Sequence, residues 1–542
     1  MALRYWVTGG TGDYNSTTNW SASSGGASGE SVPTSADDAI WDANSGAGTV
    51  VINVPSDAKS IDFTNFTGTV DFQDTLAVFG NMTLGAGMSF ANTTGTPLLR
   101  IRAAATLTSN GVAFPYDFSV LAANVIITLA DDWECNNFTH DVGSTNPAFN
   151  GNNFFINGSL SNLTTNRFIS GTTVFVMQGT GSISSLYATQ NLYRTVNNLT
   201  INTAGTITFA TSLGAVNGVW TYTAGTVITT GMTFTLAGIL DLDGITFENL
   251  YFYLGGTLLS NITYTSTITT VNSTSSTTMN GATIRHTGAT GGITNLIGQA
   301  GGSSRLQGTT ILSFEGSGSI DTGGSQGVIG LPITINTAGT YTPSSIFAID
   351  GSTFTYTSGT IDFSGVRLDL RQNNQTATFN GISSLTFNEL LMGTGANNVY
   401  VVLNDTMNVN TIIAQSSSGS VDAINRFSGT HAFVCNVFQV NGGRRQVIEL
   451  QDGLTYTINN KLSSPYVSIV TQVVQYPKIQ STSSGSKANI NLPFGADQEL
   501  YYVQFEDIDA SSGQTLWTFG SFPAITNCDN INKFTQPKAV GI

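Results

Sequence analysis

Charged side chains are scarce in this sequence. Asp, Glu, Lys and Arg make up 9% of the 542 residues, whereas soluble domains average about 25%. The charges are also unbalanced, with a formal net charge of −15. Because a protein that binds nucleic acid needs a basic surface to displace counterions, we expect no nucleic-acid partner. The low charge does not indicate disorder, since 40% of the residues are hydrophobic and 10% are aromatic.

Cysteine, long apolar runs and helical periodicity are also missing. The three cysteines lie far apart and form neither a disulfide framework nor a zinc-binding CxxC spacing. The longest apolar run, "VLAANVIITLA" from Val120, is too short to cross a bilayer, so we expect no membrane insertion. The opening "MALRYWVTGG" lacks the apolar core of a signal peptide. We therefore expect the protein to be made and assembled in a cytoplasm.

What the sequence does contain is a repeat rich in Thr and Gly. "INTAGTITF" from Ile201 is echoed by "INTAGTYTP" from Ile335, 134 positions later (335 − 201). "TYTAGTV" from Thr221 is echoed by "TYTSGTI" from Thr355 at the same offset. Short runs that alternate Thr with β-branched or aromatic residues and end at Gly indicate strands joined by tight turns. The repeat therefore predicts an all-β chain.

Two all-β architectures fit this pattern. One is a β-solenoid whose coils of about 20–25 residues stack at the ~4.8 Å spacing of β-strands. The other is a string of β-sandwiches. We favour the solenoid, because it explains a low-charge surface on which Thr, Ser and Asn form ladders, and because no linker interrupts residues 60–460. We divide the chain into a Trp-rich N-terminal cap or attachment region (1–60), a solenoid (61–460) and a C-terminal β module (461–542).

Three groups of acidic residues are candidate sites. Asp37, Asp38 and Asp42 lie in the Trp-rich N-terminal region, where they could bind calcium or line turns. Glu506, Asp507 and Asp509 could bind a cation or sugar hydroxyls, or protect a strand edge from aggregation.

The third group is the one candidate for catalysis. "LDLDGITFE" carries Asp241, Asp243 and Glu248, and the first two would be about 7 Å apart on one strand face. Glycosidases use two carboxyl groups at about 5–9 Å. The alternative interpretation is that these acids approach a turn, since Gly244 follows directly.

Both ends of the chain resemble known proteins. The pattern "RYWVTGGTG…NWS…SGG…SVPTSADDAIWDANSG" and the closing "YPKIQSTSSGSKANI" to "YYVQFEDIDASSGQTLWTF" are similar to a family of tailed-phage virion proteins, described as tail-fibre or structural proteins. The resemblance implies a right-handed parallel β-helix, a homotrimer, contacts with other virion proteins, and action at the host cell surface. It implies no catalytic residue.

These observations give three functional hypotheses. The first is a non-enzymatic fibre or spike, on tail or head, that binds host cell-surface polysaccharide through exposed Tyr, Trp and Asn and needs no cofactor except, as a candidate, Ca²⁺. The second is a spike depolymerase that uses Asp241 and Asp243. The third is a bacterial solenoid adhesin, which would require an export signal.

Overall fold

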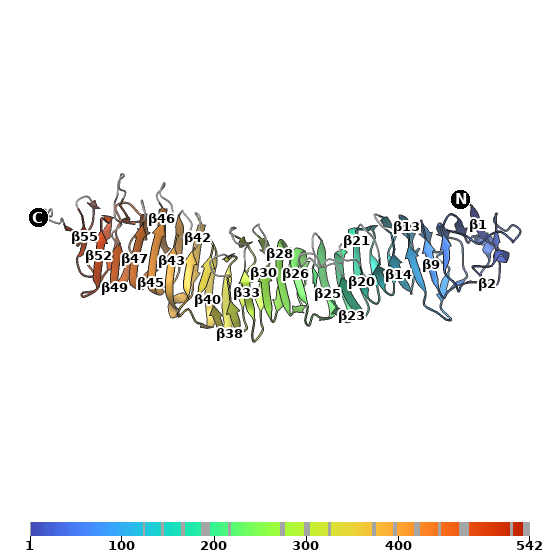
Figure 1. Ribbon diagram of the computed structural model, residues 1–542, viewed down its shortest axis with the longest axis horizontal. Coiled ribbons are helices and arrows are strands. Elements are labelled where there is room, and N and C mark those ends of the chain that lie inside the picture. Colours follow the sequence, from blue (N-terminus) through green and yellow to red (C-terminus); the bar gives the residue numbers. More distant parts are fainter. Residues whose placement is uncertain are drawn as a thin grey trace, which may run out of the picture. The chain divides into compact units, whose positions relative to one another are not determined.

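The computed structural model of the chain describes residues 2–122, 125–141, 146–163, 169–185, 196–214, 218–270, 277–296, 304–322, 327–370, 375–393, 398–416, 423–442, 446–464, 476–520 and 524–534. They belong to two compact units, Met1–Thr263 and Tyr264–Ile542. Both units are built from short strands that stack in parallel as the coils of a β-solenoid (Figure 1). The prediction of an all-β parallel solenoid is confirmed.

Helices contribute little to the described residues. They are the single-turn 3₁₀ helices η1 (Thr17–Asn19), η2 (Ala43–Ser45) and η3 (Ile382–Ser384). Pairing between the strands is parallel, and the exception among the described registers is β1 (Leu3–Trp6), which runs antiparallel to β3 (Trp20–Ser21). In the described part of the chain, no helix is long and apolar enough to span a membrane.

The first unit shows how one inward position is used again in each coil. Its strands β9 (Thr75–Val78), β12 (Leu98–Ile101), β14 (Asp117–Val120), β17 (Phe138–His140), β20 (Leu160–Asn162) and β22 (Gly181–Ser185) pair in succession. One residue of each strand faces its equivalent in the next coil, and these residues are Leu76, Leu99, Phe118, Phe138, Leu160 and Ile183. All six are at most 1% exposed. Burying each side chain contributes about 1.5–3 kcal/mol, so this ladder is one stabilising row of the core.

The second unit contains several strands of seven to eleven residues with a polar outer surface. Its strands include β38 (Ile333–Pro343), β40 (Thr353–Ile361), β43 (Thr386–Met392), β45 (Met407–Ser416), β47 (Phe433–Gly442) and β49 (Thr455–Ser464). On the outside, Asn436 donates to Asn410 at 2.9 Å, and Asn459 donates to Asn436 at 3.3 Å. The predicted outward ladders of polar side chains are therefore present.

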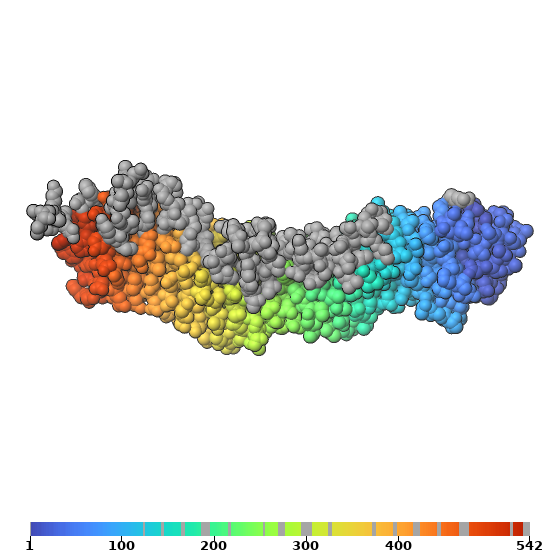
Figure 2. Space-filling view, in the orientation of Figure 1, coloured from blue at the N-terminus to red at the C-terminus, as the bar shows by residue number. Residues whose placement is uncertain are grey.

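Coil length varies more than the repeat suggests. Thr69 pairs with Ser89, 20 positions further along the chain, whereas Glu449 pairs with Gln480, 31 positions further along. Within each unit, the colours of Figure 2 change in chain order from coil to coil. Each coil therefore packs against its sequence neighbours, as in other solenoids.

The 134-residue echo encodes the same corner twice. In the first unit, the Thr203 hydroxyl donates to the Gly179 carbonyl at 2.8 Å and accepts from the Gly205 amide at 2.8 Å. In the second unit, the Thr337 hydroxyl makes the same pair of contacts with two equivalent glycines. Both threonines are at most 5% exposed. The repeated letters thus satisfy backbone groups where the chain turns, which buried backbone requires.

Tryptophan lies mainly in the core. The three N-terminal rings pack with centroids 5.2–6.0 Å apart. Trp517 is 38% exposed. The other five are each at most 1% exposed, and they are Trp6, Trp20, Trp41, Trp133 and Trp220. The N-terminal Trp residues thus form a packed cluster, as a Trp-packed cap would, and the exposed Trp of the sugar-binding hypothesis is limited to Trp517, because large aromatic rings bury much apolar area in a core.

Candidate functional site

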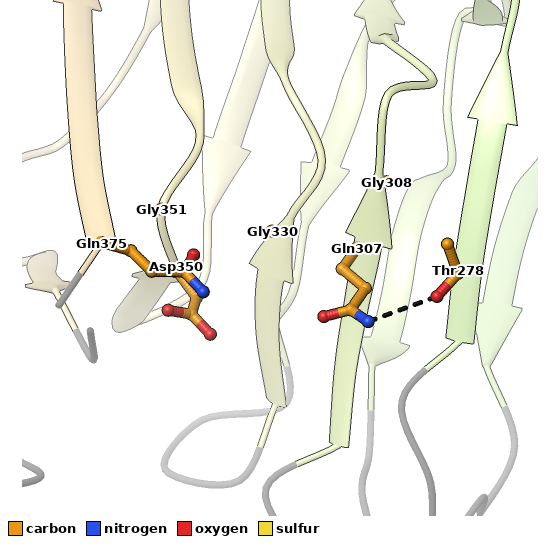
Figure 3. A pocket seen from close by; sticks show the side chains of 7 residues that line it. All are labelled: Thr278, Gln307, Gly308, Gly330, Asp350, Gly351 and Gln375. Carbon is orange, nitrogen blue, oxygen red and sulfur yellow. Dashed lines mark hydrogen bonds between the residues drawn. The ribbon is translucent and has the colours of Figure 1, made fainter. Parts of the chain in front are cut away.

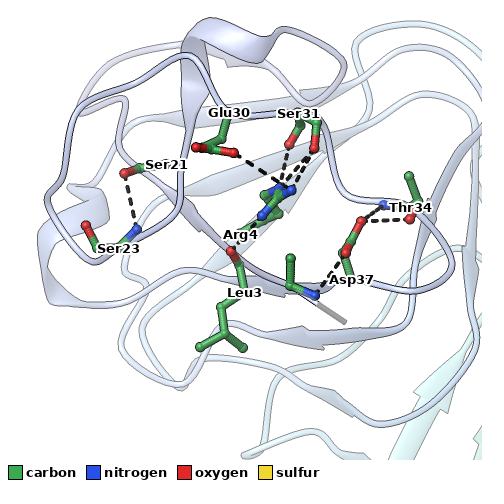
Figure 4. Close-up of polar contacts among 9 residues, drawn as sticks. Leu3, Arg4, Ser21, Ser23, Glu30, Ser31, Thr34 and Asp37 are labelled. Atoms are coloured by element: carbon green, nitrogen blue, oxygen red, sulfur yellow. Dashed lines mark hydrogen bonds and ion pairs between the residues drawn. The ribbon is translucent and has the colours of Figure 1, made fainter.

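Asp37, in the predicted N-terminal acidic group, is engaged in local structure (Figure 4). Its carboxylate accepts hydrogen bonds from the Ala2 amide at 3.1 Å and from the amide and hydroxyl of Thr34 at 3.2 and 2.7 Å. The Thr34 hydroxyl, above all, lowers the pKa of Asp37. Asp37 therefore ties the first strand to the loop before β4 (Asp38–Ile40).

Asp38 and Asp42 have separate roles. Asp38 accepts from Ser60 at 2.5 Å and lies 3.6 Å from Lys59, both in the next coil. The Asp42 carboxylate accepts from the Asn44 amide at 2.9 Å and caps η2. Each of the three predicted acids thus holds a different piece of backbone or a neighbouring coil. This arrangement corresponds to the turn-lining alternative of the sequence analysis.

Two of the C-terminal acids make contacts of the same kind. Glu506 pairs with Lys478 on the preceding coil. Asp509 accepts from the Ser511 amide at 2.8 Å, and the hydroxyl and amide of Ser511 lower its pKa. These contacts join coils and hold a turn.

Asp507 is held by two neighbouring segments. Its carboxylate accepts from the Asn527 side chain and from the Gly485 amide, the latter at 2.8 Å. The Asn527 contact is the main reason that the pKa of Asp507 is lowered. The carboxylate therefore connects segments on both sides of its own coil.

No metal-binding group emerges from these acids. In the residues that the structure describes, no three or more His, Cys, Asp or Glu side chains are grouped so that they could hold an ion. Calcium at either cluster stays a prediction without a ligand set.

The candidate catalytic acids do not share a strand. Strand β26 (Thr233–Asp241) ends at Asp241, and the exposed Asp243 lies in the turn that follows. The Asp243 amide donates to Ser260 Oγ at 3.0 Å. Glu248 accepts from the Gly231 amide at 2.6 Å. The expected placement of Asp241 and Asp243 on one strand face is therefore wrong, because the strand ends before the turn that contains the next glycine, at φ +99°.

His286, which follows Arg285 in the sequence, is buried. His286 is 0% exposed, and its Nδ1 lies 2.5 Å from the Tyr341 hydroxyl and its Nε2 lies 3.2 Å from the Thr290 carbonyl. A proton on Nε2 satisfies both contacts, since Nδ1 then accepts from Tyr341. Burial lowers the pKa of His286. The neutral ring therefore completes the core and has no access to a substrate.

A polar groove in the second unit is the best candidate for a binding site (Figure 3). Its volume is about 280 Å³. Its lining comes from β31 (Thr277–Gly281), β34 (Ser304–Gly308), β37 (Gly327–Gly330), the corner after β39 (Ile346–Ile349) and β42 (Gln375–Asn380). The lining residues are Thr278, Gln307, Gly308, Gly330, Asp350, Gly351 and Gln375.

Strand register places these residues in a row across five successive coils. Thr278 pairs with Gln307, and Gln307 pairs with Gly330. Ile349, the last residue of β39, pairs with Ile329. The next residue, Asp350, is therefore level with Gly330. Figure 3 shows Gln307 and Thr278 on one side of the Gly330 strand and Asp350 and Gln375 on the other.

Glycine makes the hollow in this row. A Cβ at Gly330 would lie 3.1 Å from the Leu306 and Asp350 carbonyl oxygens and 3.5 Å from the Gln307 Cβ, so a side chain there would be tight against the backbone and would project beside that of Gln307. Gly351 has φ +61°, and a Cβ there would lie 1.9 Å from Gln375 Oε1. The absence of a side chain at Gly351 thus gives room to the Gln375 amide.

The lining has the chemistry of a hydrogen-bonding surface. The amides of Gln307 and Gln375 and the hydroxyl of Thr278 offer both donors and acceptors, whereas Asp350 is only 3% exposed. Gln307 Nε2 donates to Thr278 Oγ1 at 3.2 Å, which orients its amide along the row. Among the lining residues that the structure describes, Asp350 is the sole acid, and Lys, Arg and His are absent.

The groove was missed by sequence reasoning. Each coil contributes one or two residues to it, and these are common residue types with no motif around them. Gln307 and Gln375 each lie beside a glycine of a neighbouring coil. This pattern would have indicated a groove only if the coil boundaries had been known. Strand pairing supplies those boundaries.

Comparisons with known proteins add no relative. The chain matches no family model, no curated protein and no solved structure.

Proposed function

We propose that this protein is a non-enzymatic fibre or spike, on the tail or head of a tailed bacteriophage, that binds polysaccharide on the host cell surface. The resemblance of both chain ends to phage virion proteins motivates the virion assignment. The parallel β-solenoid fits such proteins, and it also serves proteins of other kinds.

The polar groove is the observation that carries the binding part of the proposal. It is concave, it is lined by a few convergent polar groups, and its residues come from strands and their corners. A concave site with a few convergent polar groups can orient a ligand, although this lining lacks the apolar side chains of a typical small-molecule pocket. Sugar hydroxyls donate and accept hydrogen bonds as the lining groups do.

The small number of carboxyl groups in the described lining favours binding without cleavage. Hydrolysis of a glycosidic bond generally uses two carboxyl groups at about 5–9 Å. Asp350 is one carboxyl group, and the other described lining residues carry none. We therefore assign the groove to recognition.

A trimer would increase the avidity of weak sites without new contacts. Light scattering of the purified chain is expected to give three times the subunit mass of 56.9 kDa. A monomer at micromolar concentration would contradict the trimer. Multivalent binding would then require several copies of the chain on one particle.

Adsorption competition tests the proposed function directly. Purified protein is added to host cells before the phage that encodes it. We expect it to bind the cells and to slow phage adsorption, whereas the protein should bind weakly to cells stripped of surface polysaccharide. Equal binding to intact and stripped cells would contradict glycan recognition.

A further inference from the structure

We infer that the groove on the second unit binds a neutral polysaccharide segment that lies across the coils, along the stacking direction of the strands. This inference rests on the proposed function and specifies the ligand class and its orientation.

The orientation follows from how the lining is supplied. Thr278, Gln307, Gly330, Asp350 and Gln375 come from five successive coils. Four steps of ~4.8 Å between neighbouring coils give a row about 19 Å long. A row of this length offers contacts to several consecutive sugar units, whereas a ligand lying along one strand would meet the lining of a single coil.

The neutral class follows from the chemistry of the lining. Sites for uronic acids, sialic acids or sulfated sugars pair the anionic group with Arg or Lys through charge-assisted hydrogen bonds. The described lining contains neither. It offers the amides of Gln307 and Gln375 and the hydroxyl of Thr278, which are the partners that sugar hydroxyls require. Uncharged sugars can satisfy these groups without leaving a desolvated anion in the groove.

The spacing of large and small residues fixes where the chain of sugars would sit. Gly330 lies between Gln307 and Asp350, and Gln375 lies one coil beyond Asp350. Three coil steps of ~4.8 Å separate Gln307 from Gln375, about 14 Å, so consecutive sugar units would bond the two amides, with one unit over Gly330. The Gln307–Thr278 hydrogen bond keeps one amide oriented before binding, which reduces the entropy lost on association.

The test uses the whole chain and a panel of hexasaccharides in saturation-transfer NMR and calorimetry. The neutral probes are maltohexaose, mannohexaose and N-acetylchitohexaose, and the anionic probe is hexagalacturonate. We expect at least one neutral probe to bind and hexagalacturonate to bind at least about tenfold more weakly, a difference of ~1.4 kcal/mol.

Two variants locate the binding. Gly330→Gln fills the hollow, and Gln307→Ala removes an amide without adding bulk. We expect each to weaken binding of the neutral probe about tenfold or more, as the loss of ~1.4 kcal/mol implies. The matched control is Gln439→Ala on β47, since Gln439 is a half-buried glutamine that donates to Asn441 at 2.6 Å, outside the groove. Circular dichroism shows whether Gly330→Gln folds. If it does not, the affinity of Gln307→Ala for the neutral probe alone tests whether binding occurs in the groove.

Three results would overturn the inference: binding unchanged in Gln307→Ala, tighter binding of hexagalacturonate, or no binding of any neutral probe. In each case the virion assignment stands or falls separately, because it is tested by the presence of the chain in purified particles.

Discussion

The Tyr356 hydroxyl donates a hydrogen bond to the Gly359 carbonyl oxygen at 2.7 Å, three residues further along the same strand. Tyr222 makes the same contact with Gly225 at 2.6 Å, 134 positions earlier. In both places the ladder to the preceding strand shifts register after the isoleucine that pairs with the tyrosine. The two copies therefore share a bulged corner held by one threonine and one tyrosine.

Removing the threonine hydroxyl should destabilise this corner. Thr337→Val keeps the shape but leaves the Gly316 carbonyl and the Gly339 amide without their partner. Leaving buried backbone groups unsatisfied costs about 1–3 kcal/mol, and we expect that loss in urea unfolding. Thr360→Val on the exposed side of β40 is the control and should change stability by less than about 0.5 kcal/mol. Equal stability of the two variants would contradict the assigned role of Thr337.

The glycine of the corner should not tolerate a side chain. Gly359 has φ +109°, and a Cβ there would lie 2.5 Å from Thr337 Cγ2. Gly359→Ala therefore combines backbone strain of about 1–3 kcal/mol with a steric clash. Gly365→Ala provides a comparison, because Gly365 has φ +75° and no atom lies within 4 Å of where the new methyl group would be. Thermal unfolding should show the larger loss for Gly359→Ala, and the reverse order would refute the clash.

Acid should weaken the fold through its buried histidines. Burial lowers the pKa of His286 and of His140, which lies 3.1 Å from Asn162 Oδ1. Tyr264 and Tyr341 pack against His286 and stay neutral, because burial raises the pKa of each. An unfolded histidine has a pKa near ~6.5, so the unfolded chain binds protons that the folded chain does not.

The sign of the effect follows from these lowered pKa values. Stability from the two histidines is fully present above about pH 7 and decreases as pH falls through ~6.5 toward the lowered folded values. His286→Gln should reduce the slope of unfolding free energy against pH between about 5 and 7. The exposed Thr360 gives the control variant Thr360→Val, which changes no titratable group and should keep the wild-type slope. An unchanged slope in His286→Gln would show that the pKa of His286 is not lowered by folding.

The protein should not cleave polysaccharide. Asp241 ends a strand and Asp243 lies in the next turn, and the described lining of the groove contains one carboxylate. We expect no release of reducing ends when the purified chain is incubated with host polysaccharide. Release that disappears in Asp241→Asn or Asp243→Asn would support the depolymerase hypothesis instead and would disprove the non-enzymatic assignment.

The sequence predicted the fold better than it predicted the site. Alternation of Thr with Ile, Val, Phe and Tyr reveals strands locally, and the "INTAGT" echo marks equivalent corners. The groove is different, because Thr278, Gln307, Gly330 and Gln375 are brought together by coils of unequal length. Unequal coil lengths leave no fixed period in the sequence that would align these four residues.

The roles of the acidic residues could not be read from the sequence for a related reason. Asp37, Asp38 and Asp42 stand out in a sequence with so little charge, yet their carboxylates hold the backbone and a neighbouring coil. A carboxylate that accepts from a nearby amide or hydroxyl looks the same in a sequence as one that awaits a ligand. Only the contacts distinguish the two.

The central claim is that this chain is a component of a phage particle, and quantitative mass spectrometry of density-purified particles tests it most directly. The account predicts peptides of this chain at a fixed number of copies per particle, in a multiple of three, that remain after a salt wash. Particles that lack the chain, while it accumulates in the lysed host, would contradict the account.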